Sequence, residues 1–249
     1  MNKIGILIIA TNRYIQFVSP LIESIRTYFP HENRIIFYVF TNQEIEGVDI
    51  RRIEIDHCPW PGITLYRYRI FSEYAEILAE SDYLFYIDAD MKVVDTIGPE
   101  ILPGRGLVGV IHPGFYDRPG EGTYETNSNS TAYVKPSAAS RYFAGGFNGG
   151  IAEAFLKMAS TLAQNIEQDE TKGITAIWHD ESHLNRYFFD HPPEISLPPS
   201  YCYPENWLFL FDKQVRSFFL IEKYWDWIKH ARLGKKILAL DKAHAEIRS

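Results

Sequence analysis

Two carboxylates, Asp88 and Asp90, stand one residue apart directly after the apolar run Tyr83–Ile87, in the stretch YLFYIDADMKVVD. Two acids this close together repel each other unless a cation lies between them. The pattern Asp-x-Asp offers hard oxygen ligands that suit Mn²⁺ or Mg²⁺, ions that often complete their coordination shell with phosphate oxygens and water. The pair therefore predicts a metal site facing a phosphorylated ligand. In the alternative interpretation Asp88 caps a turn and Asp90 is solvated.

A different chemistry can also begin at a strand that ends in Asp-x-Asp. In one type of phosphatase the first Asp of this pattern attacks a phosphate group. That reaction needs further acids and a lysine downstream, and we identify no such set in this sequence. The phosphatase remains the weaker alternative.

A second group of acids, Asp180 and Glu181, lies beside Trp178 in the stretch WHDES. Such a group is typical of a sugar site, where an indole packs on the apolar face of the ring. The carboxylates there hold hydroxyls and stabilise a positively charged sugar centre. Alternatively, both acids only favour the positive end of a helix that begins in this stretch.

The first acidic pair follows a β-α-β pattern. Residues 4–9 and 34–40 are continuous apolar runs typical of strands covered on both faces, and apolar residues at helical spacing lie between them. One further predicted helix carries five residues on one face: Ile70, Phe71, Tyr74, Ile77 and Leu78. It leads into the apolar run before the acidic pair. We expect an α/β fold with a mostly parallel sheet, whose ligands bind beyond the carboxyl ends of the strands.

The rest of the chain continues this pattern less regularly. Residues 107–112 predict a strand, and the stretch DRPGEGTYETNSNST predicts a mobile surface loop. The segment RYFAGGFNGG carries four glycines in six residues and precedes a predicted helix, and WHDESHLNRYFF predicts the first turns of another. Neither a repeat nor a low-complexity linker is present. One compact domain with a C-terminal extension is the simplest account.

The composition sets limits on the partners. A chain of 249 residues with 46% hydrophobic residues can build one large core. The net charge of −7 and the lack of a long basic run argue against a nucleic-acid surface. The apolar run at the N-terminus is too short for a signal peptide or a membrane span, and the two cysteines, Cys58 and Cys202, favour a reducing compartment. We therefore expect a cytoplasmic location.

Taken together, the motifs resemble glycosyltransferase family 6, the family of the histo-blood-group A and B transferases. The resemblance runs in order through IGILIIATNRY, YVFTNQ, EILPG, HPGFY, TAYV, AGG-x-x-GG, WHDESHLN and KAHAEIR, which is nearly the whole chain. Each piece alone is weak, whereas their shared order and spacing are specific. The chain is most similar to a bacterial-type catalytic domain that retains the Asp-x-Asp pair, because it starts at the first predicted strand.

The resemblance implies the GT-A fold, a single domain with a mostly parallel, Rossmann-like central sheet flanked by helices and with a C-terminal extension. Residues 1–112 would form the nucleotide-binding half, and residues 113–249 the acceptor-binding half and the C-terminal tail. The implied reaction is a retaining transfer of GalNAc or Gal from UDP-GalNAc or UDP-Gal. The sugar would pass to the 3-hydroxyl of a galactose-terminated acceptor, with or without a fucose on it, forming an α1,3 linkage. A nonenzymatic protein that binds sugar nucleotides or glycans is the alternative.

The resemblance also implies Mn²⁺ as the cofactor, with Mg²⁺ as a second candidate, and it assigns residues to each substrate. For the donor and the metal these are Ile9, Thr11, Tyr14, Arg67, Asp88, Ala89, Asp90, Ala144, Gly145, Gly146, Lys242 and Arg248. For the acceptor they are His112, Thr123, Trp178, Glu181 and Glu205. The catalytic residues would be Glu181, Asp180 and Arg67, with Glu181 acting as a nucleophile or as a stabiliser of the cationic centre.

Several of these positions have simpler interpretations. Arg67 could be an arginine on a helix surface and His112 a satisfied core histidine, while Lys242 and Arg248 could lie in a solvated tail. The small residues Ala144 and Gly146 leave room for an acetamido group, which slightly favours UDP-GalNAc. In the stretch YCYPENW the family's Asp is missing and Glu205 lies nearby. Recognition of the acceptor is therefore open.

Overall fold

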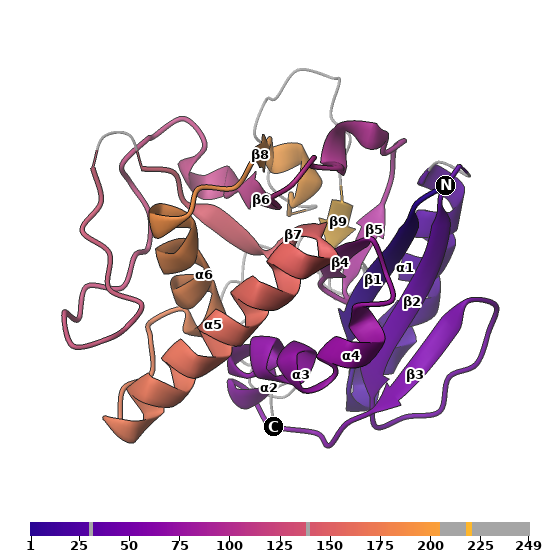
Figure 1. Cartoon of the computed structure of the whole chain (residues 1–249), viewed down its shortest axis with the longest axis horizontal. Helices are drawn as coiled ribbons and strands as arrows, with labels where there is room; N and C mark the ends of the chain where they lie inside the picture. The colour runs from indigo at the N-terminus through magenta and orange to yellow at the C-terminus, as the bar shows by residue number, and fades with distance from the viewer. Residues whose placement is uncertain (30–31, 138–139, 205–217, 221–249) are drawn as a thin grey trace, which may run out of the picture.

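The computed structural model describes residues 1–29, 32–137, 140–204 and 218–220 (Figure 1). A seven-stranded sheet has the strand order β3-β2-β1-β4-β7-β6-β8. Its strands are β1 (Lys3–Ile9), β2 (Arg34–Thr41), β3 (Ile50–Glu54), β4 (Tyr83–Ile87), β6 (Leu107–Ile111), β7 (Phe143–Ile151) and β8 (Ile195–Leu197). The strands expected at residues 4–9, 34–40, 83–87 and 107–112 are confirmed to within a residue or two.

The sheet is mostly parallel, as expected. β3, β2, β1 and β4 run parallel to one another, and β7 runs antiparallel to both of its neighbours, β4 and β6. Because β7 is reversed, its first half lies beside the carboxyl end of β4, where Ile87 pairs with Phe147. The amide of Asp88 continues this pairing by donating to the carbonyl of Gly146 at 2.9 Å. The glycine segment and the acidic pair therefore meet at one edge of the sheet.

Helices cover both faces of the sheet (Figure 1). The main ones are α1 (Val18–Tyr28), α3 (Arg67–Glu73), α5 (Ala152–Thr171) and α6 (His179–Asp190). Alternate side chains of β1 enter different cores: Ile4, Ile6 and Ile8 pack with α1, whereas Leu7 and Ile9 pack with residues of α3, α5 and α6. A strand buried on both faces has no polar alternation, which explains the continuous apolar run of β1.

Shorter elements connect this framework. They are η1 (Asn12–Phe17), α2 (Gly62–Leu65), α4 (Ala75–Leu78), β5 (Met91–Val93), η2 (Pro99–Ile101), η3 (Pro113–Phe115), η4 (Pro199–Tyr201) and β9 (Phe218–Leu220). β5 and β9 pair antiparallel as a separate two-stranded sheet. β5 follows the acidic pair directly, so the Asp-x-Asp segment is held between two strands.

The prediction of one continuous helix before β4 is wrong. α3 ends at Glu73, Tyr74 leaves the helical conformation with φ −107° and ψ 22°, and α4 then begins. The ring of Tyr74 packs 5.8 Å from that of Phe40, and its hydroxyl donates to the carbonyl of Glu54. Ile77 is 40% exposed, so it does not share the buried face. The spacing of apolar residues along a helix cannot predict these contacts of Tyr74 with β2 and with the end of β3, which accompany the break.

Two further segments differ from expectation. The stretch 117–131 forms no helix or strand, yet Tyr124, Glu125 and Ser130 within it are buried, so it is not wholly a surface loop. The glycine segment forms β7, which the sequence did not predict because glycine is depleted in strands. A methyl group at Gly149 would lie 2.5 Å from the carbonyl oxygen of Leu84. Glycine is therefore required there for the close approach of β7 to β4.

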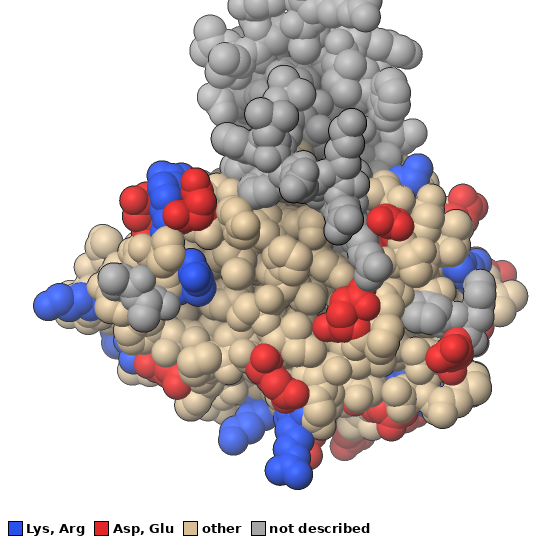
Figure 2. Space-filling model, turned by 90° about the horizontal axis from the view of Figure 1, so that it is seen from above, with Lys and Arg blue, Asp and Glu red and all other residues tan. Residues whose placement is uncertain are grey.

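The outer surface carries mixed charge. The face that Figure 2 shows carries side chains of both signs, most of them near its margins, while much of its middle is neither Lys, Arg, Asp nor Glu. Within the ranges described above, no helix is both long enough and apolar enough to span a membrane.

Candidate active site

A cavity of about 690 Å³ lies beyond the carboxyl ends of β1 and β4. Its volume is in the range typical of sites for small ligands. Its lining comes from five parts of the chain: Ile9, Thr11, Asn12, Arg13 and Tyr14; His57, Trp60, Ile63, Thr64 and Arg67; Tyr86, Asp88, Ala89 and Asp90; Gly145 and Gly146; and Ile177, Trp178, His179, Asp180 and Glu181. The two acidic motifs, far apart in the sequence, thus face one cavity.

Arg67 connects these two motifs. Its Nε lies 2.8 Å from Asp180 Oδ2 and its Nη1 lies 3.6 Å from Asp88 Oδ1. Nη1 also donates to the carbonyl of Gly145 at 3.1 Å, and the guanidinium stacks 4.2 Å from the ring centre of Tyr86. The contact with Asp180 is an ion pair rather than a hydrogen bond, because neither atom meets hydrogen-bond geometry. Arg67 is 6% exposed, so the helix-surface interpretation is wrong.

Burial shifts the ionisation of the acids beside this arginine. Asp180 is 1% exposed, and burial raises its pKa to about 7, although Arg67 works in the opposite direction. The charges of Glu181 and Asp88 raise it further, since three acids surround one arginine. The pKa of Arg67 is raised despite its burial, because Asp180 and Asp88 favour the charged form. Arg67 therefore remains a cation that holds the acids together.

The Asp-x-Asp pair is arranged to leave Asp88 partly accessible. The side chain of Asp88 is 35% exposed and its Oδ1 accepts a hydrogen bond from the hydroxyl of Tyr86. Its Oδ2 lies so close to β7 that a methyl group on Gly146 would be 2.8 Å away. Asp90 also lines the cavity and is 8% exposed.

These residues fit a Mn²⁺ or Mg²⁺ ion that takes only part of its coordination shell from the protein. Among the residues with a described placement, no group of three or more His, Cys, Asp or Glu could hold a metal by itself. Mg²⁺, however, is often bound through only one or two carboxylates, together with substrate phosphates and water. Two carboxylates at a cavity, with glycine rather than a Cβ beside one of them, meet that requirement.

Glu181 is held through both carboxylate oxygens. The hydroxyl of Tyr142 donates to Oε1 at 2.7 Å and the amide of Gly145 donates to Oε2 at 2.7 Å. Burial raises the pKa of Glu181, while these two hydrogen bonds and Arg67 favour its ionised form. The residue lies in the first turn of α6 with Asp180, so the helix dipole also favours negative charge there. The result is an oriented carboxylate facing the cavity.

Tyr142 brings the acceptor candidates together. Its ring lies 5.6 Å from that of His112, and Thr123 contributes a side-chain hydrogen bond to it. His112 and Thr123 are not in the lining of the cavity, but both lie beside the tyrosine that holds Glu181. His112 Nδ1 accepts from the amide of Gly114 at 3.0 Å, and burial lowers the pKa of His112 to about 4, so its ring is neutral at pH 7.

One part of the cavity lining comes from the last residue of β1 and the chain that follows it. Ile9, Thr11 and Tyr14, the residues assigned to uridine, all line the cavity. The hydroxyl of Thr11 lies 2.9 Å from His57 Nδ1, which comes from the loop after β3. His57 also lines the cavity, and sequence analysis did not select it because nothing near it in the sequence forms a motif.

Two tryptophans of the lining are partly exposed: Trp178 is 49% exposed and Trp60 is 41% exposed. Both indoles line the cavity, and Trp60 packs edge-on against His179 at 5.2 Å. Their exposed faces are available to the apolar side of a sugar.

Not every assigned residue reaches the cavity in this structure. Ala144 is buried in β7 and is absent from the lining, whereas Gly145 and Gly146 are part of it. Glu205, Lys242 and Arg248 lie outside the described residues. Tyr142 and Tyr86, which orient Glu181 and Asp88, were missed by the sequence reading. Each tyrosine stands two residues before a motif, and no spacing or residue type in the sequence marks it as a partner of an acid.

The sequence of the chain is similar to those of several known proteins. The model of glycosyltransferase family 6 matches residues 1–229 of the chain. The histo-blood group ABO system transferase 1 of Rattus norvegicus is 33% identical over 219 residues, which cover 83% of this chain and 62% of that protein. The globoside alpha-1,3-N-acetylgalactosaminyltransferase 1 of Canis lupus familiaris is 32% identical over 218 residues, covering 82% and 61%.

A bacterial relative matches over more of its own length. The O-antigen biosynthesis glycosyltransferase WbnI of Escherichia coli is 29% identical over 213 residues, which cover 82% of this chain and 89% of that protein. The chain therefore spans about three fifths of the two mammalian relatives and most of the bacterial one.

Proposed function

Because this chain belongs to glycosyltransferase family 6, we propose that it transfers GalNAc or Gal, with retention, from a UDP-sugar to the 3-hydroxyl of a galactose-terminated acceptor. The relatives named above include an α1,3-N-acetylgalactosaminyltransferase and a glycosyltransferase of O-antigen biosynthesis. Both names are consistent with a nucleotide-sugar donor and a glycan acceptor.

One observation carries the proposal: Asp88 and Asp90 face the same cavity as Asp180 and Glu181, with Arg67 paired to acids of both motifs. A sugar nucleotide carries a diphosphate at one end and a sugar at the other. One acidic motif suits a metal-bound diphosphate, and the other suits a sugar that develops positive charge. Simple binding would not require an oriented carboxylate such as Glu181.

Asp88 and Asp90 would hold a Mn²⁺ ion, or alternatively Mg²⁺. The bound ion would supply compensating charge for the departing diphosphate. Arg67, buried beside Asp88, keeps that carboxylate within reach of the cavity and adds positive potential on the same side. Lys242 and Arg248 remain candidates for the same task.

Glu181 would act on the sugar. Hydrogen bonds from Tyr142 and Gly145 hold its two oxygens, so little reorganisation is needed when the anomeric carbon becomes positive. Whether Glu181 attacks that carbon or only stabilises it, the requirement is an ionised and fixed carboxylate. Asp180, kept beside Arg67, would hold hydroxyls of the donor sugar.

On the acceptor side, Trp178 would pack on the galactose while Thr123 and His112 contact its hydroxyls. A slight preference for UDP-GalNAc rests on the small residues Ala144 and Gly146, of which Gly146 lines the cavity and Ala144 does not. That preference is expected to be small, because a roomy pocket rejects a smaller sugar poorly.

A panel assay tests the proposal. UDP-GalNAc and UDP-Gal are each combined with lactose or 2′-fucosyllactose, with Mn²⁺ and with EDTA, and UDP release is measured. We expect release that rises with acceptor and falls to background with EDTA. Donor binding without release in any combination would favour the binding protein, and phosphate release from a simple phosphoester would favour the phosphatase.

A further inference from the structure

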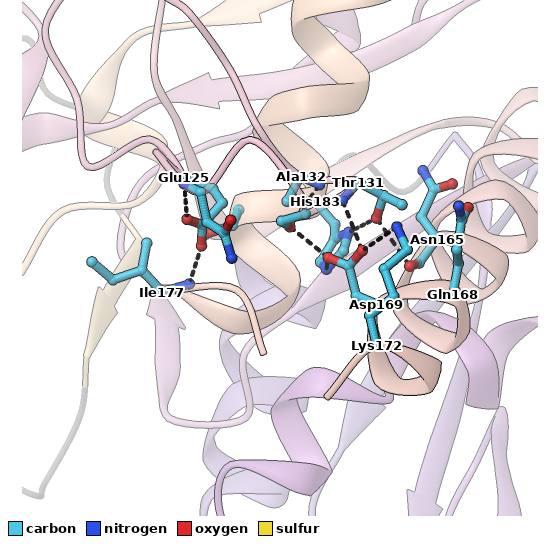
Figure 3. A network of polar contacts seen from close by, with 12 residues as sticks. Glu125, Thr131, Ala132, Asn165, Gln168, Asp169, Lys172, Ile177 and His183 are labelled. Carbon is cyan, nitrogen blue, oxygen red and sulfur yellow. Dashed lines mark hydrogen bonds and ion pairs between the residues drawn. The ribbon is translucent and has the colours of Figure 1, made fainter. Parts of the chain in front are cut away.

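Glu125 is a buried carboxylate that the proposed reaction does not use. It is 6% exposed and lies in the stretch that sequence analysis treated as a surface loop. Its Oε1 accepts from the amide of Asn127 at 2.7 Å, and its Oε2 accepts from the amide of Ile177 at 2.8 Å. Figure 3 shows Glu125 next to Ile177, apart from the group of contacts around Asp169. The carboxylate thus connects two segments that are distant in the sequence.

The segment that Glu125 holds carries Trp178. The next amide along the chain, that of Trp178, donates to Ser182 Oγ at 3.0 Å, and the carbonyl of Trp178 accepts from the amide of Glu181 at 3.0 Å. The indole itself is half exposed, so packing around its ring contributes less to its position than it would in a core. The backbone contacts on either side therefore matter for where the indole lies.

The same stretch of chain also reaches the proposed acceptor site directly. Thr123 lies two residues before Glu125, and the ring of Tyr124 packs 5.0 Å from that of Tyr142. Tyr142 in turn donates to Glu181. One short segment therefore contacts Tyr142, which holds Glu181, at one end and the amide before Trp178 at the other.

The charge of Glu125 suits its position. α6 begins at His179 and has 12 residues, so the amide of Ile177 lies just before its positive end. A carboxylate can accept from two backbone amides at once, whereas a side-chain amide offers only one acceptor oxygen. Glu125 is therefore matched to two donors in a way that Gln is not.

We propose that Glu125 is a positioning residue for the acceptor, which sets the distance between Trp178 and Thr123 by holding the amide of Ile177. The proposal rests on the proposed function, because it assumes that Trp178 and Thr123 contact the acceptor. It assigns Glu125 no contact with either substrate. Its loss should therefore affect acceptor binding and leave the donor side intact.

Two substitutions separate the contacts of Glu125. Glu125→Gln keeps the size but leaves one of the two amides facing an NH₂ group. Glu125→Asp keeps the charge, and its shorter side chain still suits the contact with the amide two residues on but does not reach Ile177. Asp169→Asn is the matched control, since Asp169 is 1% exposed and accepts from the amide of Thr131 at 2.8 Å and from the hydroxyl of Ser130.

The readouts are the KM for the better of lactose and 2′-fucosyllactose, the KM for the UDP-sugar, acceptor-free hydrolysis of the donor, and Tm. Both Glu125 variants are expected to raise the acceptor KM about tenfold, with the donor KM and donor hydrolysis within about twofold of the wild type. Asp169→Asn should lower Tm about as much as the Glu125 variants do, while its acceptor KM stays within about twofold of the wild-type value. If Glu125→Gln does not fold, the acceptor KM of Glu125→Asp decides whether the inference holds.

The inference would be overturned by an unchanged acceptor KM in the Glu125 variants, or by an equal rise of the acceptor KM in Asp169→Asn. Equal losses of transfer and donor hydrolysis would also do so, because they would indicate a general structural role. These results leave the proposed function standing. A wild-type protein whose UDP release does not respond to either acceptor would instead refute the proposed function itself.

Discussion

Replacing Arg67 with Met tests whether one buried cation holds the two acidic motifs together. The substitution keeps most of the apolar stem and removes the guanidinium, which lies 2.8 Å from Asp180 and 3.6 Å from Asp88. Asp180 is 1% exposed, so it would be left as a buried acid without its nearest cation. Removing one partner of a buried ion pair typically costs about 3–5 kcal/mol.

The cost should depend on pH. Burial already raises the pKa of Asp180 to about 7 with Arg67 present, and without the arginine this pKa should rise further. Asp180 is charged at pH 8 in the wild type and protonated at pH 5, where it gains little from Arg67. We therefore expect Arg67→Met to lower the free energy of unfolding by about 3 kcal/mol at pH 8 and clearly less at pH 5.

Urea unfolding of the ligand-free protein at the two pH values measures this, using Arg67→Met, Asp180→Asn and the double variant. The double variant should lose less than the sum of the single ones by about 1–3 kcal/mol. Arg69→Met is the control, because Arg69 is 53% exposed at its side chain and its pair with Glu73 is worth about 1 kcal/mol or less. Equal losses for Arg67→Met and Arg69→Met, or additive losses in the double variant, would refute the reasoning.

Four further predictions concern the acids and the glycine beside them. Glu181→Gln should lower kcat about 100-fold while UDP-sugar binding by calorimetry changes less than about threefold, because the amide keeps the shape but not the charge. Asp88→Asn should remove most of the turnover supported by Mn²⁺, measured as UDP release across a Mn²⁺ titration. Gly146→Ala should raise the Mn²⁺ concentration needed for half-maximal activity, because the new methyl group would lie 2.8 Å from Asp88 Oδ2 and displace it. Asp180 has a folded pKa of about 7, above its unfolded value, so it favours folding less as pH rises from about 4 to about 7. The Tm of Asp180→Asn relative to the wild type should therefore increase between pH 5 and pH 8.

Each of these has a result that contradicts it. Normal turnover in Glu181→Gln would exclude a catalytic charge at that position, and an Mn²⁺ response in Asp88→Asn equal to that of the wild type would exclude Asp88 as a ligand. Gly145→Ala is the control for Gly146, since its methyl group would come no closer than 3.2 Å to Glu181; equal effects would indicate a general disturbance of β7. A Tm difference that does not vary with pH would mean that Asp180 does not titrate in this range. Among the described residues, burial lowers the pKa of His112 and of His183; both histidines are present in every variant, so their titration cancels in these differences.

Much of the fold follows from local sequence. The apolar runs that form β1, β2 and β4 could be recognised because a strand covered on both faces carries apolar side chains on both of them. Helical spacing located α1, α5 and α6. The Asp-x-Asp pair could be placed at the cavity because the carboxyl ends of parallel strands meet at one edge of a sheet. These inferences need only near neighbours in the chain.

The failures occurred where distant contacts outweigh local preference. The helix break at Tyr74 depends on Phe40 and Glu54, and β7 forms from a glycine segment because only glycine permits its close approach to Leu84. Local propensity carries no information about either contact.

The sequence by itself determined which residue types are present for the chemistry: two pairs of acids, a tryptophan and a mostly parallel sheet to carry them. Only the tertiary structure decided that Arg67 pairs with Asp180 as well as Asp88, and that Tyr142 and Gly145 hold Glu181. The reason is that a residue's type and its near neighbours are written along the chain. Distances and the ionisation of buried groups depend instead on which segments pack against each other and on how much water they exclude.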